Sequence, residues 1–309
     1  MDGHTGGPRQ RAAGQNPAYR AAHRHPRRLT RENVARSGVL SAPTHGNATR
    51  GPASFGSLAL GATRGQLGLT PRETAGGPRR QTSAVDTGDR AEMLRRIADA
   101  VMSVPVSHPT RVAVDGRPAS GKTTLSDELA ALLRDRGRPV IRATIDEFMH
   151  PKSIRYSRGV DSPEGCYHDS FDFDALHDAL LRPLGPRGSR RFRTRSYDRD
   201  RDLVVSMPIQ TATVDTVLLF DGVFLMRPEL NASWDLRILV STSFEESLRR
   251  ALRRDVATLG SAARVEERFR ARYLPSQEHY FDTVKPTEAA DVIVENDHPE
   301  RPSWLLKAR

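Results

Sequence analysis

One short segment constrains the fold of this chain more than any other feature. It fits the pattern G-x-x-x-x-G-K-[ST] at every fixed position and reads Gly116-Arg117-Pro118-Ala119-Ser120-Gly121-Lys122-Thr123. Glycines in this pattern let the backbone curl, so that successive N–H groups point at one phosphate group. We expect Lys122 to reach the β- and γ-phosphates of a nucleotide and the Thr123 hydroxyl to bind Mg²⁺. Such a loop needs a buried strand before it and a helix after it, whose positive N-terminus faces the anion.

The flanking residues meet both requirements. Arg111–Asp115 is a short β-branched run typical of a buried strand, and Thr123–Arg136 carries leucines at helical spacing. Further strands are predicted at Pro139–Ile145, Val214–Phe220, Leu236–Val240 and Asp291–Val294. Continuous apolar strands alternating with helices are typical of a parallel sheet covered on both faces. We therefore predict a three-layer α/β fold of the P-loop NTPase class, with a mainly parallel five-stranded sheet.

Charge divides the chain into two parts. Residues 1–84 hold 13 arginines, no lysine and three acids, a balance of +10 that equals the net charge of the whole chain. Because this segment is rich in Gly and Pro and has little periodic apolar content, we predict a disordered tail over 1–84. Residues 85–309 are predicted to form one kinase-like α/β domain. Within it, 147–213 is a predicted substrate-binding insert with a charged hairpin at Arg190–Val205, and 243–275 is a predicted arginine-rich lid.

Three interpretations of the tail stay open. Its arginines suit an arm that binds nucleic acid or a membrane surface non-specifically, and their excess over acids is also typical of an organelle transit peptide. The frequent Gly and Pro favour an extension without a function. No stretch approaches the roughly 20 apolar residues of a membrane span. Cys166 is the single cysteine, so no intramolecular disulfide forms. We expect a cytoplasmic protein without a membrane partner.

Two carboxylates at predicted strand ends are candidates for metal and proton chemistry. Asp221 follows the strand 214–220 and precedes Gly222, where a Walker B acid would hold Mg²⁺ together with Thr123. The alternative for Asp221 is a solvated strand end. Asp146 ends the strand 139–145, on the sheet edge where α/β proteins bind ligands.

The predicted lid helix carries an unusual cluster of cations, namely Arg249, Arg250, Arg253 and Arg254. Residues three and four apart share a helix face, so these arginines could either approach a γ-phosphate or form a salt-bridged surface. The sequence has neither the N-K-x-D motif of guanine-specific switches nor an L-S-G-G-Q-like signature. These features together favour a small-molecule kinase over a switch protein or a transporter ATPase.

At this level the sequence resembles the uridine kinase-like P-loop kinases, a family that includes relatives acting on pantothenate and phosphoribulose. The resemblance covers roughly residues 110–296. It rests on DGRPASGKTT, Asp146-Glu147-Phe148, Asp169-Ser170-Phe171-Asp172, Tyr197-Asp198, LLFDG, RRALRRD and KPTEAADVIV.

The resemblance implies roles for individual residues. Asp146 would be the catalytic base, Lys122 would assist phosphoryl transfer, and Arg250 and Arg253 would belong to the lid. ATP would lie on the loop residues Gly116, Ala119, Ser120, Gly121, Lys122, Thr123 and Thr124. The acceptor would contact Asp146, Tyr167, Asp169 and Tyr197.

The sequence departs from the family pattern where uridine and cytidine kinases hold the nucleoside. Gly165-Cys166 stands in place of the Phe-Asp pair that holds the ribose. In the hairpin, Arg199 and Asp202 stand where the family carries the aromatic residue and the histidine that read the pyrimidine. The phosphate chemistry is therefore better specified than the acceptor.

The sequence thus predicts an ATP- and Mg²⁺-dependent kinase that phosphorylates a hydroxyl, first of all on a nucleoside. The alternatives are a kinase of another acceptor, such as a sugar, pantothenate or a nucleotide, and an ATP-binding regulatory protein without turnover. The arginines of the insert suit an anionic acceptor, or else form a solvated hairpin. Nucleic acid is expected to bind only non-specifically, through the tail, and assembly into a homo-oligomer is left open.

Overall fold

The computed structural model describes residues 85–307, and the tail predicted over 1–84 lies outside the described residues. The central sheet has seven strands in the order β1-β11-β10-β9-β2-β8-β3. Five of them run parallel, as predicted: β3 (Val140–Thr144), β8 (Val217–Gly222), β2 (Thr110–Gly116), β9 (Leu236–Ser241) and β10 (Val292–Glu295). Two short antiparallel strands, β11 (Ser303–Leu306) and β1 (Asp86–Thr87), extend one edge and were not predicted. Runs this short carry too little periodicity to identify a strand.

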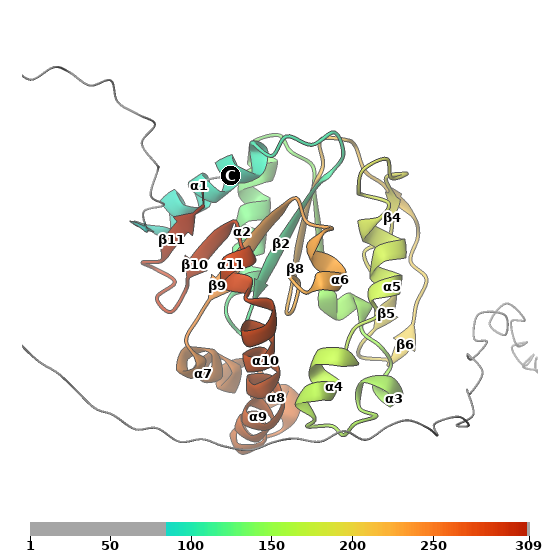
Figure 1. The fold of residues 1–309 in the computed structure, drawn as a ribbon, viewed down its shortest axis with the longest axis vertical. Helices are drawn as coiled ribbons and strands as arrows, with labels where there is room; N and C mark the ends of the chain where they lie inside the picture. The colour runs from blue at the N-terminus through green and yellow to red at the C-terminus, as the bar shows by residue number, and fades with distance from the viewer. Residues whose placement is uncertain (1–84, 308–309) are drawn as a thin grey trace, which may run out of the picture. The chain divides into compact units, whose positions relative to one another are not determined.

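Alternate residues of the strands pack into two cores on opposite faces of the sheet. Val112 and Val114 of β2 lie in the core covered by α1 (Arg90–Met102) and α2 (Lys122–Asp135). Ala113, between them, joins the core on the other face, with Leu230 of α6 (Pro228–Asn231) and Tyr280 of α10 (Leu274–Val284). Because successive side chains of a strand point to opposite faces, the sheet is covered by helices on both sides and the fold has three layers (Figure 1). Together these layers bury β2 along its whole length.

The insert and the lid contain the shorter elements. The insert comprises a 3₁₀ turn at Ile145–Phe148, α3 (Lys152–Arg155), α4 (Pro163–His168), and α5 (Phe173–Leu176), which continues as a π-helical turn at His177–Leu181. Its charged hairpin forms two ribbons, β5 (Tyr197–Asp198) with β6 (Leu203–Val204), and β4 (Arg191–Phe192) with β7 (Gln210–Thr211). The hairpin therefore ends beyond the predicted Val205. The lid comprises α7 (Phe244–Arg254), α8 (Val256–Leu259), α9 (Ala262–Arg268) and a π-helical turn at Phe269–Tyr273 that leads into α10, and α11 (Pro286–Ala289) follows α10.

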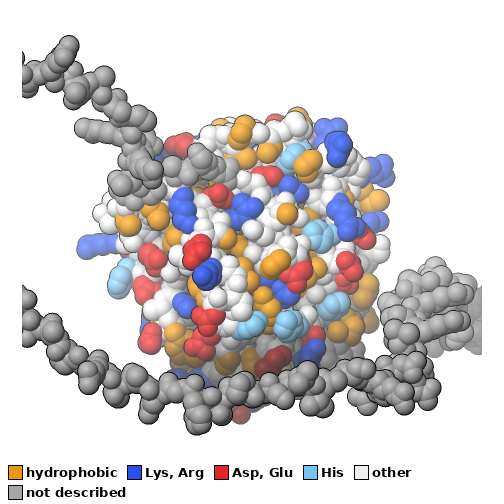
Figure 2. Space-filling model, viewed as in Figure 1, with side chains coloured by type: hydrophobic (Ala, Val, Ile, Leu, Met, Phe, Trp, Pro, Cys, Tyr) orange, Lys and Arg blue, Asp and Glu red, His pale blue; other side chains and the backbone are white. Residues whose placement is uncertain are grey.

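The surface of the described part has no strong separation of charge on the face in view. Figure 2 shows acidic and basic side chains interspersed over that face, in keeping with the balanced composition of residues 85–309. None of the helices in the described range is long and apolar enough to cross a membrane.

Candidate active site

The loop between β2 and α2 has the strained backbone that its sequence predicts. Gly121 is the N-cap of α2 and has a left-handed backbone with φ of 95°, and Ala119 also has a positive φ of 58°. Lys122 opens α2 and is only 9 % exposed. Its Nζ donates a hydrogen bond to the carbonyl oxygen of Arg117 at 2.7 Å, so the side chain folds back over the loop. Burial lowers the pKa of Lys122 to about 8, although the carboxylates of Asp115, Asp221 and Asp146 act against this.

We expect Gly121→Ala to destabilise the protein by about 2 kcal/mol and to weaken ATP binding. A left-handed backbone costs a non-glycine residue about 1–2 kcal/mol, and the new Cβ would lie 2.5 Å from Nδ2 of Asn296. The measurement is urea unfolding together with calorimetry of an ATP analogue. Gly137→Ala is the matched control, because φ there is 80° and a Cβ would meet nothing within 4 Å. Equal effects of both substitutions would contradict a specific contact at Gly121.

Thr123 and Asp221, the two predicted magnesium ligands, are in direct contact. The Thr123 hydroxyl donates to Oδ2 of Asp221 at 2.7 Å. The other oxygen of Asp221 accepts from Nη2 of Arg142 at 3.0 Å. In the sheet, Asp221 of β8 is paired with Val114 of β2 on one side and Thr144 of β3 on the other. The register of three parallel strands therefore fixes this carboxylate beside the loop.

Asp146 lies at the same edge of the sheet, in the 3₁₀ turn that follows β3. Its side chain is half exposed, and Oδ2 lies 3.5 Å from Nη1 of Arg199 in the hairpin. A cavity of about 540 Å³ brings the predicted residues together, lined by Thr123, Arg142, Ala143, Thr144, Asp146, Glu147, Thr194, Arg195, Met207 and Asp221. The loop, both strand-end carboxylates and the insert thus share one cavity.

The predicted acceptor residues other than Asp146 do not line this cavity. Tyr197 is 1 % exposed, and its hydroxyl donates to Asp202 within the hairpin. Burial, together with this hydrogen bond, raises the pKa of Tyr197 to about 12. Tyr167 lies in an aromatic cluster with the guanidinium of Arg227 over its ring at 4.0 Å. Asp169 accepts from Nε of Arg158 at 2.7 Å. In this structure Tyr197 and Asp169 contact other residues of the insert, whereas Tyr167 contacts Arg227 outside it.

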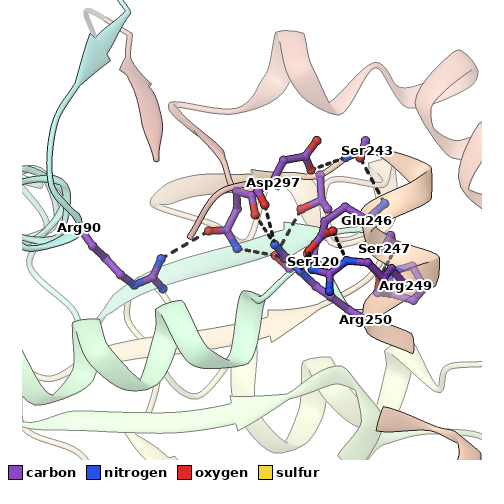
Figure 3. A network of polar contacts seen from close by, with 11 residues as sticks. Arg90, Ser120, Ser243, Glu246, Ser247, Arg249, Arg250 and Asp297 are labelled. Atoms are coloured by element: carbon purple, nitrogen blue, oxygen red, sulfur yellow. Dashed lines mark hydrogen bonds and ion pairs between the residues drawn. The ribbon is translucent and has the colours of Figure 1, made fainter. Parts of the chain in front are cut away.

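Arg250, predicted as a lid cation, instead binds the outside of the loop. Its guanidinium donates to the carbonyl oxygens of Ser120 at 3.2 Å and of Asn296 at 2.6 Å, and its Nε donates to Glu246 at 2.6 Å (Figure 3). The Asn296 amide also donates to the Ser120 oxygen, at 2.7 Å. The side chain of Arg250 from α7 and that of Asn296, which directly follows β10, therefore bind the same carbonyl oxygen of the phosphate-binding loop.

The next turn of α7 carries two further arginines, Arg253 and Arg254. Arg253, the second predicted lid cation, is exposed. The pKa of Arg254 is raised, first by its hydrogen bond to Asp255 and also by the charge of Asp146, and its own charge contributes to lowering the pKa of Lys122. The charge of Arg254 therefore interacts with Asp146 and with Lys122.

The pairing of Glu246 with two arginines predicts a pH-dependent stability. Hydrogen bonds from Arg249, then from Arg250, lower the pKa of Glu246 to about 2. A carboxyl group whose pKa is lower in the folded than in the unfolded protein stabilises the fold at any pH above its unfolded-state pKa. This contribution is lost as the pH falls toward the folded-state pKa. Glu246→Gln should therefore be less stable than wild type by about 1 kcal/mol at pH 7, with the difference shrinking below about pH 4.5. Denaturant midpoints over this range measure it, and a difference independent of pH would contradict the pairing.

Sequence reasoning missed Asp115, the penultimate residue of β2, directly before Gly116. This carboxylate is fully buried. One oxygen accepts from the Gly116 amide at 2.6 Å; the other accepts from the Leu225 amide at 2.9 Å and the Tyr280 hydroxyl at 2.5 Å. Burial raises the pKa of Asp115 despite these donors. The position of Asp115 directly before the loop could have marked it as a site residue. Its hydrogen-bond partners Leu225 and Tyr280 could not be inferred, because they lie 110 and 165 residues further along the chain.

Asn296 and Arg142 were also missed. Asn296 follows the last parallel strand, so its place at the carboxyl edge was available from the sequence. Arg142 lies within β3, where a charged residue in an apolar run was the signal. Among residues 85–307, no cluster of three or more His, Cys, Asp or Glu side chains could hold a metal ion.

Several known proteins are similar to this chain in sequence and in fold. The chain is 28 % identical to uridine-cytidine kinase B of Dictyostelium discoideum over 196 residues, which cover 60 % of this chain and 78 % of that protein. It is 27 % identical to uridine kinase of Leuconostoc citreum over 197 residues, 60 % of this chain and 87 % of the relative. A solved structure described as a possible uridine kinase from Bacillus stearothermophilus matches with a TM-score of 0.52 at 20 % identity, covering 66 % of this chain and 97 % of the other.

The solved structure supports the fold alone, because the identity to it is low. The family evidence comes from the sequence. The family described as Phosphoribulokinase / Uridine kinase matches residues 112–300, from the first core strand through the last parallel strand and the loop after it. The chain therefore belongs to the phosphoribulokinase / uridine kinase family of P-loop kinases.

Proposed function

We propose that this kinase transfers the γ-phosphate of Mg²⁺-ATP to a hydroxyl group of a nucleoside. The observation that carries the proposal is the cavity of about 540 Å³, in which Thr123 and Asp221 share walls with Asp146 and with Thr194 and Arg195 of the insert. A kinase needs a metal site, a base and an acceptor-binding insert within reach of one phosphoryl group. These parts come from segments far apart in the sequence and meet at one edge of the sheet.

The residues of the loop fit a triphosphate with its metal. Among the described residues, no side chain caps the N-terminus of α2, so its first amides are available to an anion. The buried Ser120 hydroxyl has no hydrogen-bond partner within the described structure. Thr123 and Asp221 supply the oxygen ligands that Mg²⁺ prefers. Bound Mg²⁺ would neutralise charge on the phosphates, and Lys122 would leave the Arg117 carbonyl to contact them.

A second cavity of about 540 Å³ lies between α7 and the segment that follows β10, and it could hold the part of ATP beyond the phosphates. It is lined by Arg249, Asp297, His298, Pro299, Glu300 and Arg301. Asn296, which precedes this lining, is bonded to Ser120 of the loop. We assign this cavity to the base and ribose of ATP.

Asp146 is proposed to accept the proton of the acceptor hydroxyl as that oxygen attacks phosphorus. The carboxylate is half exposed, so a hydroxyl can approach it. Arg199 lies at 3.5 Å and would orient the carboxylate until the acceptor binds. Thr194, Arg195 and Met207 would form the wall against which the acceptor rests.

A nucleoside is proposed because the curated relatives at 27–28 % identity are uridine and uridine-cytidine kinases. A second candidate is an acceptor with its own anionic group. Its support is the guanidinium of Arg199 beside Asp146, where the family pattern led us to expect pyrimidine-reading residues. A carboxylate or phosphate on the acceptor would pair with that guanidinium.

The test is ADP release by the purified protein with Mg²⁺-ATP and each of uridine, cytidine, adenosine, ribose, a sugar phosphate, a nucleotide and pantothenate. Nucleoside-dependent release at a rate well above the acceptor-free reaction supports the proposal. Release only with the anionic acceptors supports the second candidate. ATP binding by calorimetry without release in any mixture would contradict both, and would favour a regulatory ATP-binding protein.

A further inference from the structure

Three arginines at intervals of four residues line one face of the helical segment from α9 into the π-helical turn. Arg264 Nη2 lies 3.1 Å from Oδ2 of Asp161, and Arg268 Nε lies 3.2 Å from Oδ1 of the same carboxylate. Residues four apart share a helix face. Each oxygen of Asp161, in the insert between α3 and α4, is therefore bound by a different arginine of the lid.

The third arginine, Arg272, forms hydrogen bonds to the backbone on both sides of Asp161. Nη1 of Arg272 donates to the carbonyl oxygen of Val160 at 3.1 Å and to that of Ser162 at 2.9 Å. Arg272 is only 3 % exposed. Its buried charge is thus satisfied by main-chain oxygens of the insert, and Ser162 in turn is the N-cap of α4. The start of α4 is fixed to the lid by side chain and backbone together.

The same lid segment contacts the phosphate-binding loop on its other side. Leu248, Ala251, Val265 and Phe269 form a small hydrophobic core that is separate from the two cores of the sheet, and Ala119 of the loop packs against it. The Ser247 hydroxyl of α7 donates to the carbonyl oxygen of Pro118. The lid therefore contacts the loop through this small core and contacts the insert through its arginines.

We propose that Asp161 is a positioning residue that couples occupancy of the phosphate-binding loop to the position of α4. This inference rests on the proposed function in one respect, that the loop binds Mg²⁺-ATP. An anion on the loop shifts Ala119 and Pro118, the lid core moves with them, and the arginines transmit the shift to Asp161. The acceptor side of the enzyme then tightens when the donor is present.

A contribution to stability alone does not account for this arrangement. Partly exposed ion pairs add little to the stability of a fold, and Asp161 and Arg264 are about one third exposed. The contacts join residues 103 and 107 positions apart in the chain, whereas the ion pair of Glu266 with Arg270 joins two residues of one helical segment. Their geometric effect is to attach the insert to the lid.

The experiment is hydrogen exchange of peptides covering 156–169, with and without a saturating non-hydrolysable ATP analogue and Mg²⁺. In the wild type we expect the analogue to slow exchange there by about fivefold or more, the lower end of typical coupling between sites. Asp161→Asn should lose this slowing while calorimetry shows the analogue still bound. Arg268→Gln should lose it too, and the double variant should lose no more than either single one, because the residues act as one unit.

Glu266→Gln is the matched control, since it converts a carboxylate to an amide in an ion pair that lies within the same helical segment. It should keep the slowing seen in the wild type. Binding of the analogue without any change at 156–169 in the wild type would overturn the coupling and leave the proposed function intact. Slowing that persists in Asp161→Asn would likewise overturn it. Failure of the analogue to bind the wild type would contradict the proposed function, and the coupling with it.

Discussion

Lys122→Ala is expected to lower turnover by about 100- to 1,000-fold while the melting temperature stays close to that of the wild type. Loss of one group that stabilises charge in the transition state typically has an effect of that size. Stability should change little, because burial lowers the pKa of Lys122 to about 8 and its charge is therefore not favoured by the fold. Steady-state ADP formation and a thermal melt measure the two quantities.

The control for this substitution is Lys307→Ala. Lys307 also donates to main-chain oxygens, those of Thr287 at 2.7 Å and Glu288 at 2.8 Å, but it follows β11 near the antiparallel edge of the sheet. Its removal should leave turnover unchanged. Near wild-type turnover in Lys122→Ala would show that the loop does not hold the transferred phosphate.

Asp146→Asn is expected to lower turnover by about 100- to 10,000-fold, the usual contribution of general-base catalysis, with ATP affinity retained. The amide keeps the shape of the side chain but cannot take a proton. In the proposed function the loop amides, Lys122 and Thr123 would hold the donor independently of this residue. Calorimetry with an ATP analogue and acceptor-dependent ADP formation should therefore separate binding from chemistry.

Glu147→Gln is the comparison for Asp146→Asn, because Glu147 lines the same cavity and is ion-paired with Arg195. A larger loss in Glu147→Gln than in Asp146→Asn would move the base to Glu147. Collapse of ATP affinity in Asp146→Asn would instead make Asp146 an organiser of Mg²⁺.

The parts of the fold that were predictable are those with a periodic or fixed local pattern. The five parallel strands have continuous apolar runs, and the loop has a motif whose spacing is set by phosphate geometry. The antiparallel edge was not predictable, because β1 is a two-residue strand and pairs with Trp304 and Ser303 at the other end of the domain. Pairing over such a separation leaves no local signal.

The residues of the candidate site also fall into those that the sequence could predict and those that it could not. Thr123, Asp221 and Asp146 meet because strand ends of a parallel sheet share an edge, which topology alone implies. For the lid arginines the sequence left a phosphate contact and a salt-bridged surface open, because helical spacing gives a shared face but not the direction of that face. Arg250 therefore binds the Ser120 carbonyl, and Tyr197 is buried within its own hairpin, where tertiary packing decides the outcome.

The buried carboxylate at the end of β2 has a consequence for how the sequence can vary. Asp115 and Tyr280 are 165 residues apart and share a hydrogen bond in the core. A phenol buried without an acceptor is costly, and so is a carboxylate that loses a donor. Among relatives, positions 115 and 280 should thus change together, with phenylalanine replacing the tyrosine wherever the residue before the first loop glycine is apolar.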